Sequence, residues 1–178
     1  MKKNVILGIT GSISAYKACE LIRELKKAHC ETTCILTKEA AKFITALTVE
    51  TLSGNKSYCD MFVLPEKREA IHISLADKAD IIVICPATAN IIAKIAGGIC
   101  DDLLTSTIVA SSKPVFVAPA MNEKMYKNKI TQRNIKELKK YGYEIMEPVK
   151  GQLACGYQGI GHLAPIHDIT KRIRKILQ

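Results

Sequence analysis

The sequence has few aromatic residues: tryptophan is absent, and aromatic residues make up 5% of the 178 positions. The basic residues are not interleaved with aromatic ones, as they are on surfaces that stack on single-stranded nucleic acids. The net charge of +9 alone favours a nucleic-acid partner. The lysines, however, concentrate in two expected surface helices, residues 124–140 and 171–175. We therefore predict a solvated basic face that attracts small anionic substrates, and no binding to nucleic acid.

Long hydrophobic runs are also missing. No apolar segment reaches the ~20 residues that a membrane-spanning helix needs. The first apolar run, residues 5–10, is too short for the core of a signal sequence, and no cleavage-like site follows it. An apolar fraction of 48% and a charged fraction of 24% are typical of a soluble globular protein. We therefore expect a cytoplasmic protein without membrane contact, with one domain over residues 1–178.

The seven cysteines form neither a metal-binding nor a disulfide pattern. No C-x-x-C pair occurs, and the four histidines do not fall at zinc spacing with them. We therefore predict no metal site and no disulfide framework. Cys19, Cys34 and Cys85 have apolar neighbours and are predicted to be small buried side chains. Cys155 lies instead in a glycine-rich segment and needs a different explanation.

Apolar runs and helical periodicity alternate along the chain. Residues 4–10 are typical of a buried parallel strand, and Ala15, Ala18 and Ile22 then recur at helical spacing. The expected strands are residues 4–10, 31–37, 79–85 (ended by Pro86), 114–118 and 143–146. The expected helices are residues 14–28, 38–52 with a break at 43–45, 90–96, 102–110, 128–141 and 166–177. This order predicts an α/β fold, a single-domain doubly wound parallel sheet.

Ligands of such sheets bind beyond the carboxyl ends of the strands, so the segments that follow strands are the candidates for chemistry. Gly11 and Ser12 follow the first strand, where a tight turn leads into a helix whose N–H groups can hold an anion. The segment is neither a Walker A loop nor a G-x-G-x-x-G fingerprint. It predicts either a mononucleotide phosphate site or a structural turn. Thr88 and Asn90, after the third strand, can each cap a helix or contact a ligand.

Further positions have both a structural and a chemical interpretation. Asp101 suits the N-cap of a helix, so Asp101 and Asp102 are predicted to cap rather than to catalyse. Asn122 can donate an amide hydrogen bond to a carboxylate or cap a helix. Residues 151–161 contain four glycines and are predicted to form an irregular loop. His72 lies between apolar residues, which is more typical of a packed core side chain than of a base.

Taken in chain order, these segments resemble the family of homo-oligomeric flavin-containing cysteine decarboxylases. The resemblance covers about residues 4 to 165 and is most specific in P-A-M-N-x-x-M (119–125) and L-A-C-G (153–156). The weaker matches are Gly11-Ser12-Ile13, His72-Ile73, Pro86-Ala87-Thr88-Ala89-Asn90 and Asp101-Asp102-Leu103-Leu104. The resemblance implies a Rossmann-like flavoprotein with bound FMN.

The resemblance also implies roles for individual residues. His72 would be the active-site base, Asn122 would hold the substrate carboxylate, and Cys155 would be a proton donor. The substrate contacts would be Asn122, Met125, Ala154 and Cys155. The FMN contacts would be Gly11, Ser12, Ile13, Thr37, Phe43, Thr88, Ala89, Asn90, Ile91 and Ala120.

The chemistry of the family explains these residue types. Decarboxylation needs an electron sink, and the flavin creates one by oxidising the cysteine substrate to a thioaldehyde. His72 would take up the proton of the substrate thiol. Loss of CO2 gives an enethiol, which the reduced flavin and Cys155 then convert to the saturated thiol. Cys155 can act as the acid because a free thiol of pKa ~8.5 is mostly protonated at neutral pH.

Cys155 distinguishes two activities within this family. Relatives that oxidatively decarboxylate the C-terminal cysteine of a peptide stop at the enethiol and lack the cysteine motif. Its presence implies the full cycle, from 4'-phosphopantothenoylcysteine to 4'-phosphopantetheine in coenzyme A biosynthesis. The peptide activity and a non-catalytic flavin-binding regulatory subunit are the alternatives.

The resemblance implies partners as well. Family members form homotrimers that sometimes assemble into dodecamers, with FMN near subunit contacts. Many bacterial relatives continue into a C-terminal synthetase domain that joins cysteine to phosphopantothenate. Because this sequence ends at Gln178, the resemblance implies a separate synthetase in the pathway. One departure is His162, which stands where relatives usually have another basic residue after the last glycine of the cysteine loop.

Overall fold

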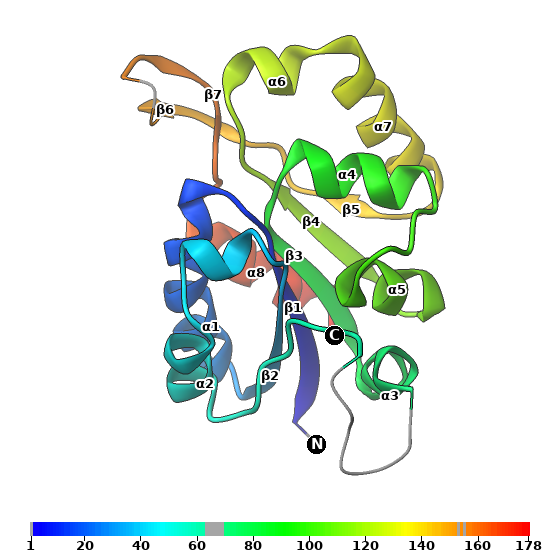
Figure 1. Ribbon diagram of the computed structural model, residues 1–178. Helices are drawn as coiled ribbons and strands as arrows, with labels where there is room; N and C mark the ends of the chain where they lie inside the picture. Colours follow the sequence, from blue (N-terminus) through cyan, green and yellow to red (C-terminus); the bar gives the residue numbers. More distant parts are fainter. Residues whose placement is uncertain (1, 63–69, 153, 155) are drawn as a thin grey trace.

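The chain folds around a five-stranded sheet (Figure 1). A computed structural model describes residues 2–62, 70–152, 154 and 156–178. The strand order is β2-β1-β3-β4-β5, and every neighbouring pair is parallel. The strands are β1 (Lys3–Ile9), β2 (Cys30–Leu36), β3 (Ile81–Ala87), β4 (Val115–Pro119) and β5 (Glu144–Ile145). The predicted α/β doubly wound parallel sheet is therefore confirmed.

Helices cover both faces of this sheet (Figure 1). One face carries α1 (Ala18–Lys27), α2 (Ala46–Ser53) and α8 (Ile166–Ile176). The other carries α3 (Ile71–Lys78), α4 (Ala89–Ala96), α5 (Leu103–Ala110) and α7 (Lys129–Lys140). Because both faces are covered, Val5 and Leu7 of β1 enter one core and Ile6 enters the other. Among the described residues, none of the helices is long and apolar enough to cross a membrane.

Three short helices lie at the carboxyl end of the sheet. They are η1 (Ile13–Lys17), η2 (Ala40–Lys42) and α6 (Glu123–Lys127). The expected helix 14–28 therefore begins as the 3-10 turn η1 before it becomes α1. The expected break at residues 43–45 is confirmed, because η2 ends at Lys42 and α2 begins at Ala46.

The prediction of an irregular loop for residues 151–161 is wrong over most of that segment. β6 (Val149–Gln152) and β7 (Gln158–His162) form a separate two-stranded antiparallel sheet. This hairpin stands beyond the carboxyl end of the main sheet (Figure 1). Most of its residues are at least partly exposed, so the sequence has no apolar alternation that would reveal the strands.

Two other expectations also need correction. The third strand does not end at Pro86, because β3 continues to Ala87. Asp102, not Asp101, is the N-cap of α5: its carboxylate accepts the N–H of Thr105 at 2.8 Å, and Thr105 completes a capping box. Burial works against its charged form, yet the bonds from Thr105 and Lys94 lower the pKa of Asp102 overall. The prediction that this acidic pair has a capping role is thus confirmed for Asp102.

Two of the three cysteines that were expected to be buried are core side chains. Cys34 and Cys85 are buried in the core, and burial raises the pKa of each thiol to about 12. Cys19 is only half-buried, although it packs against the same core. Thiols with such high pKa values remain protonated and unreactive at neutral pH.

Candidate active site

Thr10 joins two turns at the point where the strand order reverses, between β1 and β3. Its hydroxyl donates to the carbonyl of Pro86 at 2.7 Å and accepts the N–H of Thr88 at 3.1 Å. Thr10 is buried, so both bonds are shielded from water. Open α/β sheets bind ligands at such a switch point. The turns after β1 and β3, which the sequence indicates as candidates for chemistry, therefore meet at this switch point.

Backbone bonds bring the turns after β2 and β4 to the same place. The N–H of Thr37 donates to Ile9 at 3.0 Å, and that of Ala120 donates to Ala87 at 2.9 Å. Gly11 lies against the turn after β2: a Cβ at this position would be 2.4 Å from Cβ of Glu39. Only glycine allows the two turns to approach so closely. Four post-strand turns thus form one contiguous surface.

Helix caps account for some of the polar side chains on this surface. Ser12 accepts the N–H of Ser14 at 3.3 Å and begins η1. Thr88 accepts the N–H of Ile91 at 3.3 Å and begins α4, whereas Asn90 is exposed within the first turn. The first N–H groups of α4 have no intrahelical acceptor and give this end of the helix a partial positive charge. The side chain of Ile91 is buried in the core, so only its backbone is directed toward the turn.

Large apolar side chains at this end remain exposed. Ile13 has 57% and Phe43 has 49% of its surface accessible, and Leu47 is more exposed still. The three lie on η1 and around the break between η2 and α2. Exposed apolar side chains close together are typical of a ligand or partner surface.

A pocket of about 430 Å³ opens between the turns after β1 and β4 and the β6–β7 hairpin. This volume lies within the usual range for small-molecule sites. Its lining includes Ser12, Ile13, Asn122 and Ala154, which were predicted as site residues from distant parts of the sequence. The remaining lining residues are Ser14, Tyr16, Lys17, Met121, Gln152, Gly161 and His162.

Asn122 has a fixed orientation in this pocket. As the N-cap of α6 it accepts the N–H of Lys124 on Oδ1 at 2.8 Å, and its Nδ2 donates to the hydroxyl of Tyr157 at 3.0 Å. A backbone N–H can only donate, so Oδ1 faces Lys124 and the amide nitrogen is directed toward Tyr157. The capping role that the sequence allowed is confirmed.

The hairpin is held directly against the segment that carries Asn122. The N–H of Met121 donates to Gly161 at 3.0 Å, and the N–H of Ile160 donates to Glu123 at 3.3 Å. A hydrogen bond from Lys127 and a second from Ile160 lower the pKa of Glu123, which keeps this acceptor ionised. The hairpin therefore forms one wall of the pocket.

A family model described as flavoprotein matches residues 1–178. The chain belongs to the flavoprotein family. It is 41% identical to a probable phosphopantothenoylcysteine decarboxylase of Streptococcus mutans over 99% of this chain and 100% of that protein. It is 43% identical to the coenzyme A biosynthesis bifunctional protein CoaBC of Bacillus subtilis, over 97% of this chain but 43% of that protein. The chain thus spans about two fifths of the bifunctional relatives it matches.

Solved structures of flavoprotein relatives superpose on nearly the whole chain. A cysteine-to-serine mutant of PPC decarboxylase, complexed with pantothenoylaminoethenethiol, matches with a TM-score of 0.91 and 35% identity over 98% of both chains. The FMN-binding protein AtHal3 matches with a TM-score of 0.87 and 35% identity over 98% of this chain and 96% of that one. The fold of this flavoprotein is therefore that of both proteins.

Three of the predicted catalytic or substrate-binding residues are not placed in the pocket of this flavoprotein. His72 is half-buried on α3, which leads into the amino end of β3, and it is not among the described residues that line the pocket. Met125 lies on α6 and is also outside that lining. Cys155 lies outside the described residues, although its neighbour Ala154 lines the pocket.

Sequence reasoning missed Lys17, Tyr157 and Gln152 as pocket or site residues. Lys17 lies shortly after the Gly11-Ser12-Ile13 segment, and this closeness in sequence was a usable signal. Tyr157 bonds to Asn122 across 35 positions, and no local pattern predicts such a contact. Gln152 belongs to the hairpin that the sequence did not reveal.

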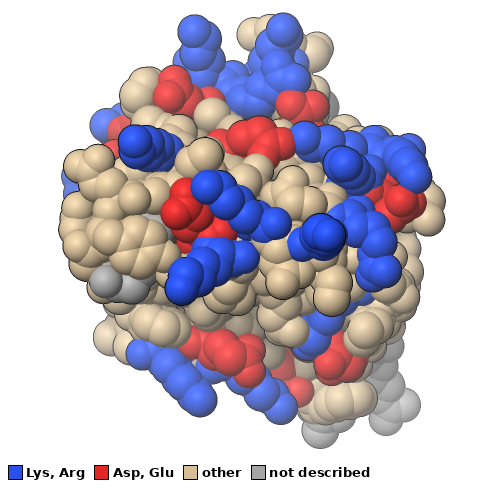
Figure 2. Space-filling model, turned by 90° about the horizontal axis from the view of Figure 1, so that it is seen from above, with Lys and Arg blue, Asp and Glu red and all other residues tan. Residues whose placement is uncertain are grey.

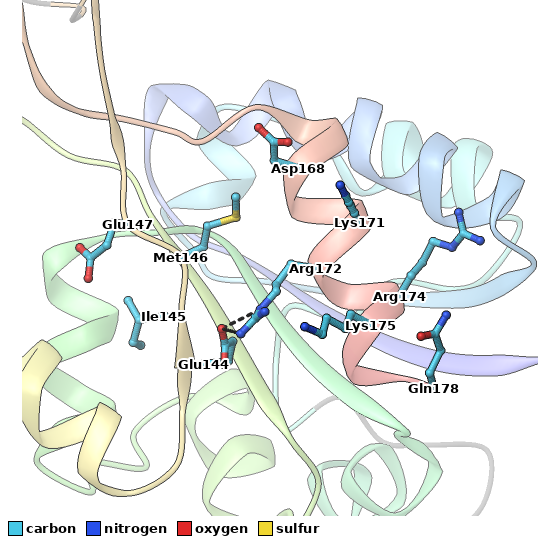
Figure 3. Close-up of a pocket in the computed structure, with 10 residues that line it drawn as sticks. All are labelled: Glu144, Ile145, Met146, Glu147, Asp168, Lys171, Arg172, Arg174, Lys175 and Gln178. Atoms are coloured by element: carbon cyan, nitrogen blue, oxygen red, sulfur yellow. Dashed lines mark hydrogen bonds and ion pairs between the residues drawn. The ribbon is translucent and has the colours of Figure 1, made fainter.

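A larger pocket of about 720 Å³ lies elsewhere, between β5 and α8 (Figure 3). Figure 3 shows basic side chains of α8 along it, with Arg172 turned toward Glu144, whose carboxylate accepts from Nε at 2.8 Å. None of its lining residues was predicted as a site residue, and none follows one of the central strands β1 to β3. Size alone therefore does not identify the active site.

The carboxyl end of the sheet carries a basic surface. Figure 2 views the molecule from the end that is uppermost in Figure 1, where α6 and the hairpin lie, and Lys and Arg side chains are spread over this face with Asp and Glu between them. The net charge of the chain is +9. Such a field attracts small anions toward the candidate site.

Proposed function

We propose that this chain is an FMN-dependent decarboxylase that converts 4'-phosphopantothenoylcysteine to 4'-phosphopantetheine in coenzyme A biosynthesis. The observation that carries the proposal is the pocket that joins the turn after β1, Asn122 and the segment next to Cys155. The relative from S. mutans, matched over its full length, supports the same reaction. Residues 1–178 would act as one domain, in the cytoplasm.

The residues at the switch point fit FMN. Gly11 permits a close-packed turn, and the starts of η1 and α4 offer N–H groups to a phosphate. Exposed Ile13 and Phe43 offer apolar surface to a flat aromatic ring. The full set that would hold FMN is Gly11, Ser12, Ile13, Thr37, Phe43, Thr88, Ala89, Asn90, Ile91 and Ala120. Bound FMN supplies reversible two-electron chemistry, which turns the thiol-bearing carbon of the substrate into an electron sink.

Asn122 would orient the carboxylate that leaves as CO2. Its Oδ1 accepts from Lys124 and its Nδ2 donates to Tyr157, so an N–H of the same amide group would be the donor to the substrate carboxylate. A neutral amide positions a carboxylate without the strong attraction of an ion pair, which would oppose the departure of CO2. Met125, Ala154 and Cys155 would complete the substrate contacts.

His72 would act from a neighbouring subunit. Within one chain it lies on α3, away from the lining of the Asn122 pocket. We propose a homotrimer, able to assemble further into a dodecamer, in which His72 of one copy faces the Asn122 pocket of the next. The exposed side chains of Phe43 and Leu47 would be covered at such a contact. His72 would take up the substrate thiol proton, since imidazole titrates near neutral pH.

Cys155 would complete the reaction by donating a proton to the enethiol carbon. The hydride taken up by FMN in the first half of the cycle would return to the neighbouring carbon, and this hydride and the proton together would give the saturated thiol. The cofactor would end the cycle oxidised, so no external oxidant is needed. An oxidative decarboxylase of peptidyl cysteine would omit this reduction. The solved PPC decarboxylase mutant, in which a cysteine is replaced and an enethiol is bound, supports this role for a cysteine.

The pathway partner would be a synthetase that joins cysteine to phosphopantothenate and so supplies the substrate. The B. subtilis relative is a bifunctional protein of coenzyme A biosynthesis, which places a second pathway activity beside this fold in that organism.

The variant Cys155→Ser tests the proposed cycle. FMN-loaded variant protein and 4'-phosphopantothenoylcysteine should yield CO2 and an enethiol that is two hydrogens lighter than 4'-phosphopantetheine, with bleached flavin absorbance. Mass spectrometry and the visible spectrum measure both. Wild-type turnover by Cys155→Ser would remove the proton-donor role, and protein that fails to bind added FMN would contradict the whole proposal.

A further inference from the structure

The pocket that contains Asn122 also contains a lysine–histidine contact. Lys17, at the end of η1, places its Nζ 3.0 Å from Nε2 of His162, at the end of β7. The other ring nitrogen of His162 lies 3.2 Å from the carbonyl oxygen of Gln152. An ammonium only donates and a carbonyl only accepts. The pairing therefore fixes the neutral imidazole with its hydrogen on Nδ1, while Nε2 accepts from Lys17.

Glycines fix the position of the His162 ring. A Cβ at Gly151 would be 3.0 Å from Cγ of His162, so the ring lies directly over this glycine. At Gly161 φ is 139°, and a Cβ would be 2.1 Å from the carbonyl oxygen of Met121. Glycine at both positions lets β7 lie against the segment after β4. The ring thus holds Lys17 from a rigid part of the hairpin.

Lys17 has no acidic partner. It is the one Lys or Arg among the described residues that line the pocket, and none of those residues is Asp or Glu. Within residues 2–62, 70–152, 154 and 156–178, no ion pair joins Lys17 to a carboxylate. His162 accepts one of the three ammonium hydrogens, which leaves two as donors. A half-buried ammonium with two remaining donors and no carboxylate beside it is suited to an anionic ligand.

We propose that Lys17 binds the phosphate of the substrate and that His162 is a positioning residue that holds Lys17 in place. The inference rests on the proposed function, which supplies a substrate with a phosphate at one end and a cysteine carboxylate at the other. A phosphate monoester carries about −1.5 to −2 charges at neutral pH and presents only strong acceptors. Lys17 and Asn122 lie on different elements of one pocket. Together they would recognise both anionic ends of the substrate.

Binding of two unreactive thiols tests this assignment. FMN-loaded wild-type protein should bind 4'-phosphopantetheine about 10- to 100-fold more tightly than pantetheine, measured by isothermal titration calorimetry. Lys17→Met should abolish the preference, and Lys17→Arg should keep part of it. The matched control is Lys27→Met: Lys27 is an exposed lysine of α1 that pairs with Glu24, and its loss should leave the preference intact.

The positioning role of His162 is tested by its effect on the preference for the phosphorylated thiol. His162→Leu removes the acceptor and should lower the preference for the phosphorylated thiol several-fold, whereas His162→Gln offers a carboxamide oxygen to Lys17 and should restore it. In steady-state turnover both Lys17→Met and His162→Leu should raise KM for the phosphorylated substrate and leave kcat nearly unchanged. Equal effects of His162→Leu and His162→Gln would overturn the positioning role.

The phosphate of FMN is the competing ligand for Lys17. FMN affinity, measured by quenching of flavin fluorescence, should be unchanged in Lys17→Met. Weaker FMN binding with an intact preference between the two thiols would assign Lys17 to the cofactor and overturn the proposal, as would equal binding of both thiols by wild-type protein. CO2 release is measured in a separate assay. A protein that prefers the phosphorylated thiol but releases no CO2 would support this inference and contradict the decarboxylase proposal.

Discussion

At the scale of single residues, Asn122 combines a structural and a proposed chemical role. Its Oδ1 caps α6 through Lys124, its Nδ2 donates to the hydroxyl of Tyr157, and the residue lines the pocket. Asn128 caps α7 in the same way, accepting the N–H of Ile130 at 2.9 Å, but it is not among the residues that line the pocket. The chain therefore offers a matched pair of asparagine caps, of which one is expected to contact substrate.

The variants Asn122→Asp and Asn128→Asp separate these roles. Aspartate is as good an N-cap as asparagine, so both variants should keep the wild-type melting temperature. A carboxylate at position 122 repels the substrate carboxylate, so Asn122→Asp should raise KM at least about tenfold, while Asn128→Asp leaves KM unchanged. Thermal denaturation and steady-state kinetics check both. Equal KM values for the two variants would remove Asn122 from substrate binding.

Single residues were predictable from the sequence where their role is local. The caps at Thr88 and Asn122 follow from residue type and position after a strand. The contact between Lys17 and His162 spans 145 positions, and only the folded hairpin brings the two together. Such long-range pairs depend on tertiary packing, which no local pattern encodes.

At the scale of elements, the parallel strands and long helices were predictable because their apolar patterns are strong. β1 and β3 are buried on both faces, so each is a continuous apolar run. α3 was missed because it is short and has no side-chain N-cap at Ala70. The β6–β7 hairpin was missed because its strands are held by backbone hydrogen bonds and by contact with Met121 rather than by apolar packing.

A glycine substitution tests how the hairpin is attached. Gly161→Ala would place a Cβ 2.1 Å from the carbonyl oxygen of Met121 and should destabilise the protein by about 1–3 kcal/mol through this clash. Gly98→Ala is the control: φ there is 66° and a Cβ meets nothing within 4 Å, so only the backbone cost of ~1 kcal/mol applies. Urea denaturation measures both. Equal losses would mean that the hairpin tolerates displacement from Met121.

At the scale of the whole molecule, one chain brings together only part of the expected catalytic set. The pocket holds Asn122 and Ala154, whereas His72 lies on α3 beside α5. The resemblance to the family assigned His72, Asn122 and Ala154 to one site. The sequence does not indicate which copy of the chain supplies each residue. A symmetric assembly of identical chains resolves this if each site takes its base from a neighbour.

Complementation between two inactive variants tests this arrangement. At a substrate concentration well below KM, His72→Asn and Asn122→Asp should each show little activity alone. Native mass spectrometry should detect each variant as trimers or larger assemblies. Refolding an equal mixture should restore activity, because some mixed sites receive an intact His72 from one chain and an intact Asn122 from the other. No recovery in assemblies shown to contain both variants would place the two residues in the same chain's site.

The central claim is a complete decarboxylation cycle on a phosphorylated cysteine substrate, and the mass of its product tests it most directly. FMN-loaded wild-type protein is incubated with 4'-phosphopantothenoylcysteine, and the product is measured by high-resolution mass spectrometry. The account predicts a product lighter than the substrate by CO2 alone, which is 4'-phosphopantetheine. A product lighter by CO2 and two further hydrogens, or unchanged substrate in the presence of bound FMN, would contradict it.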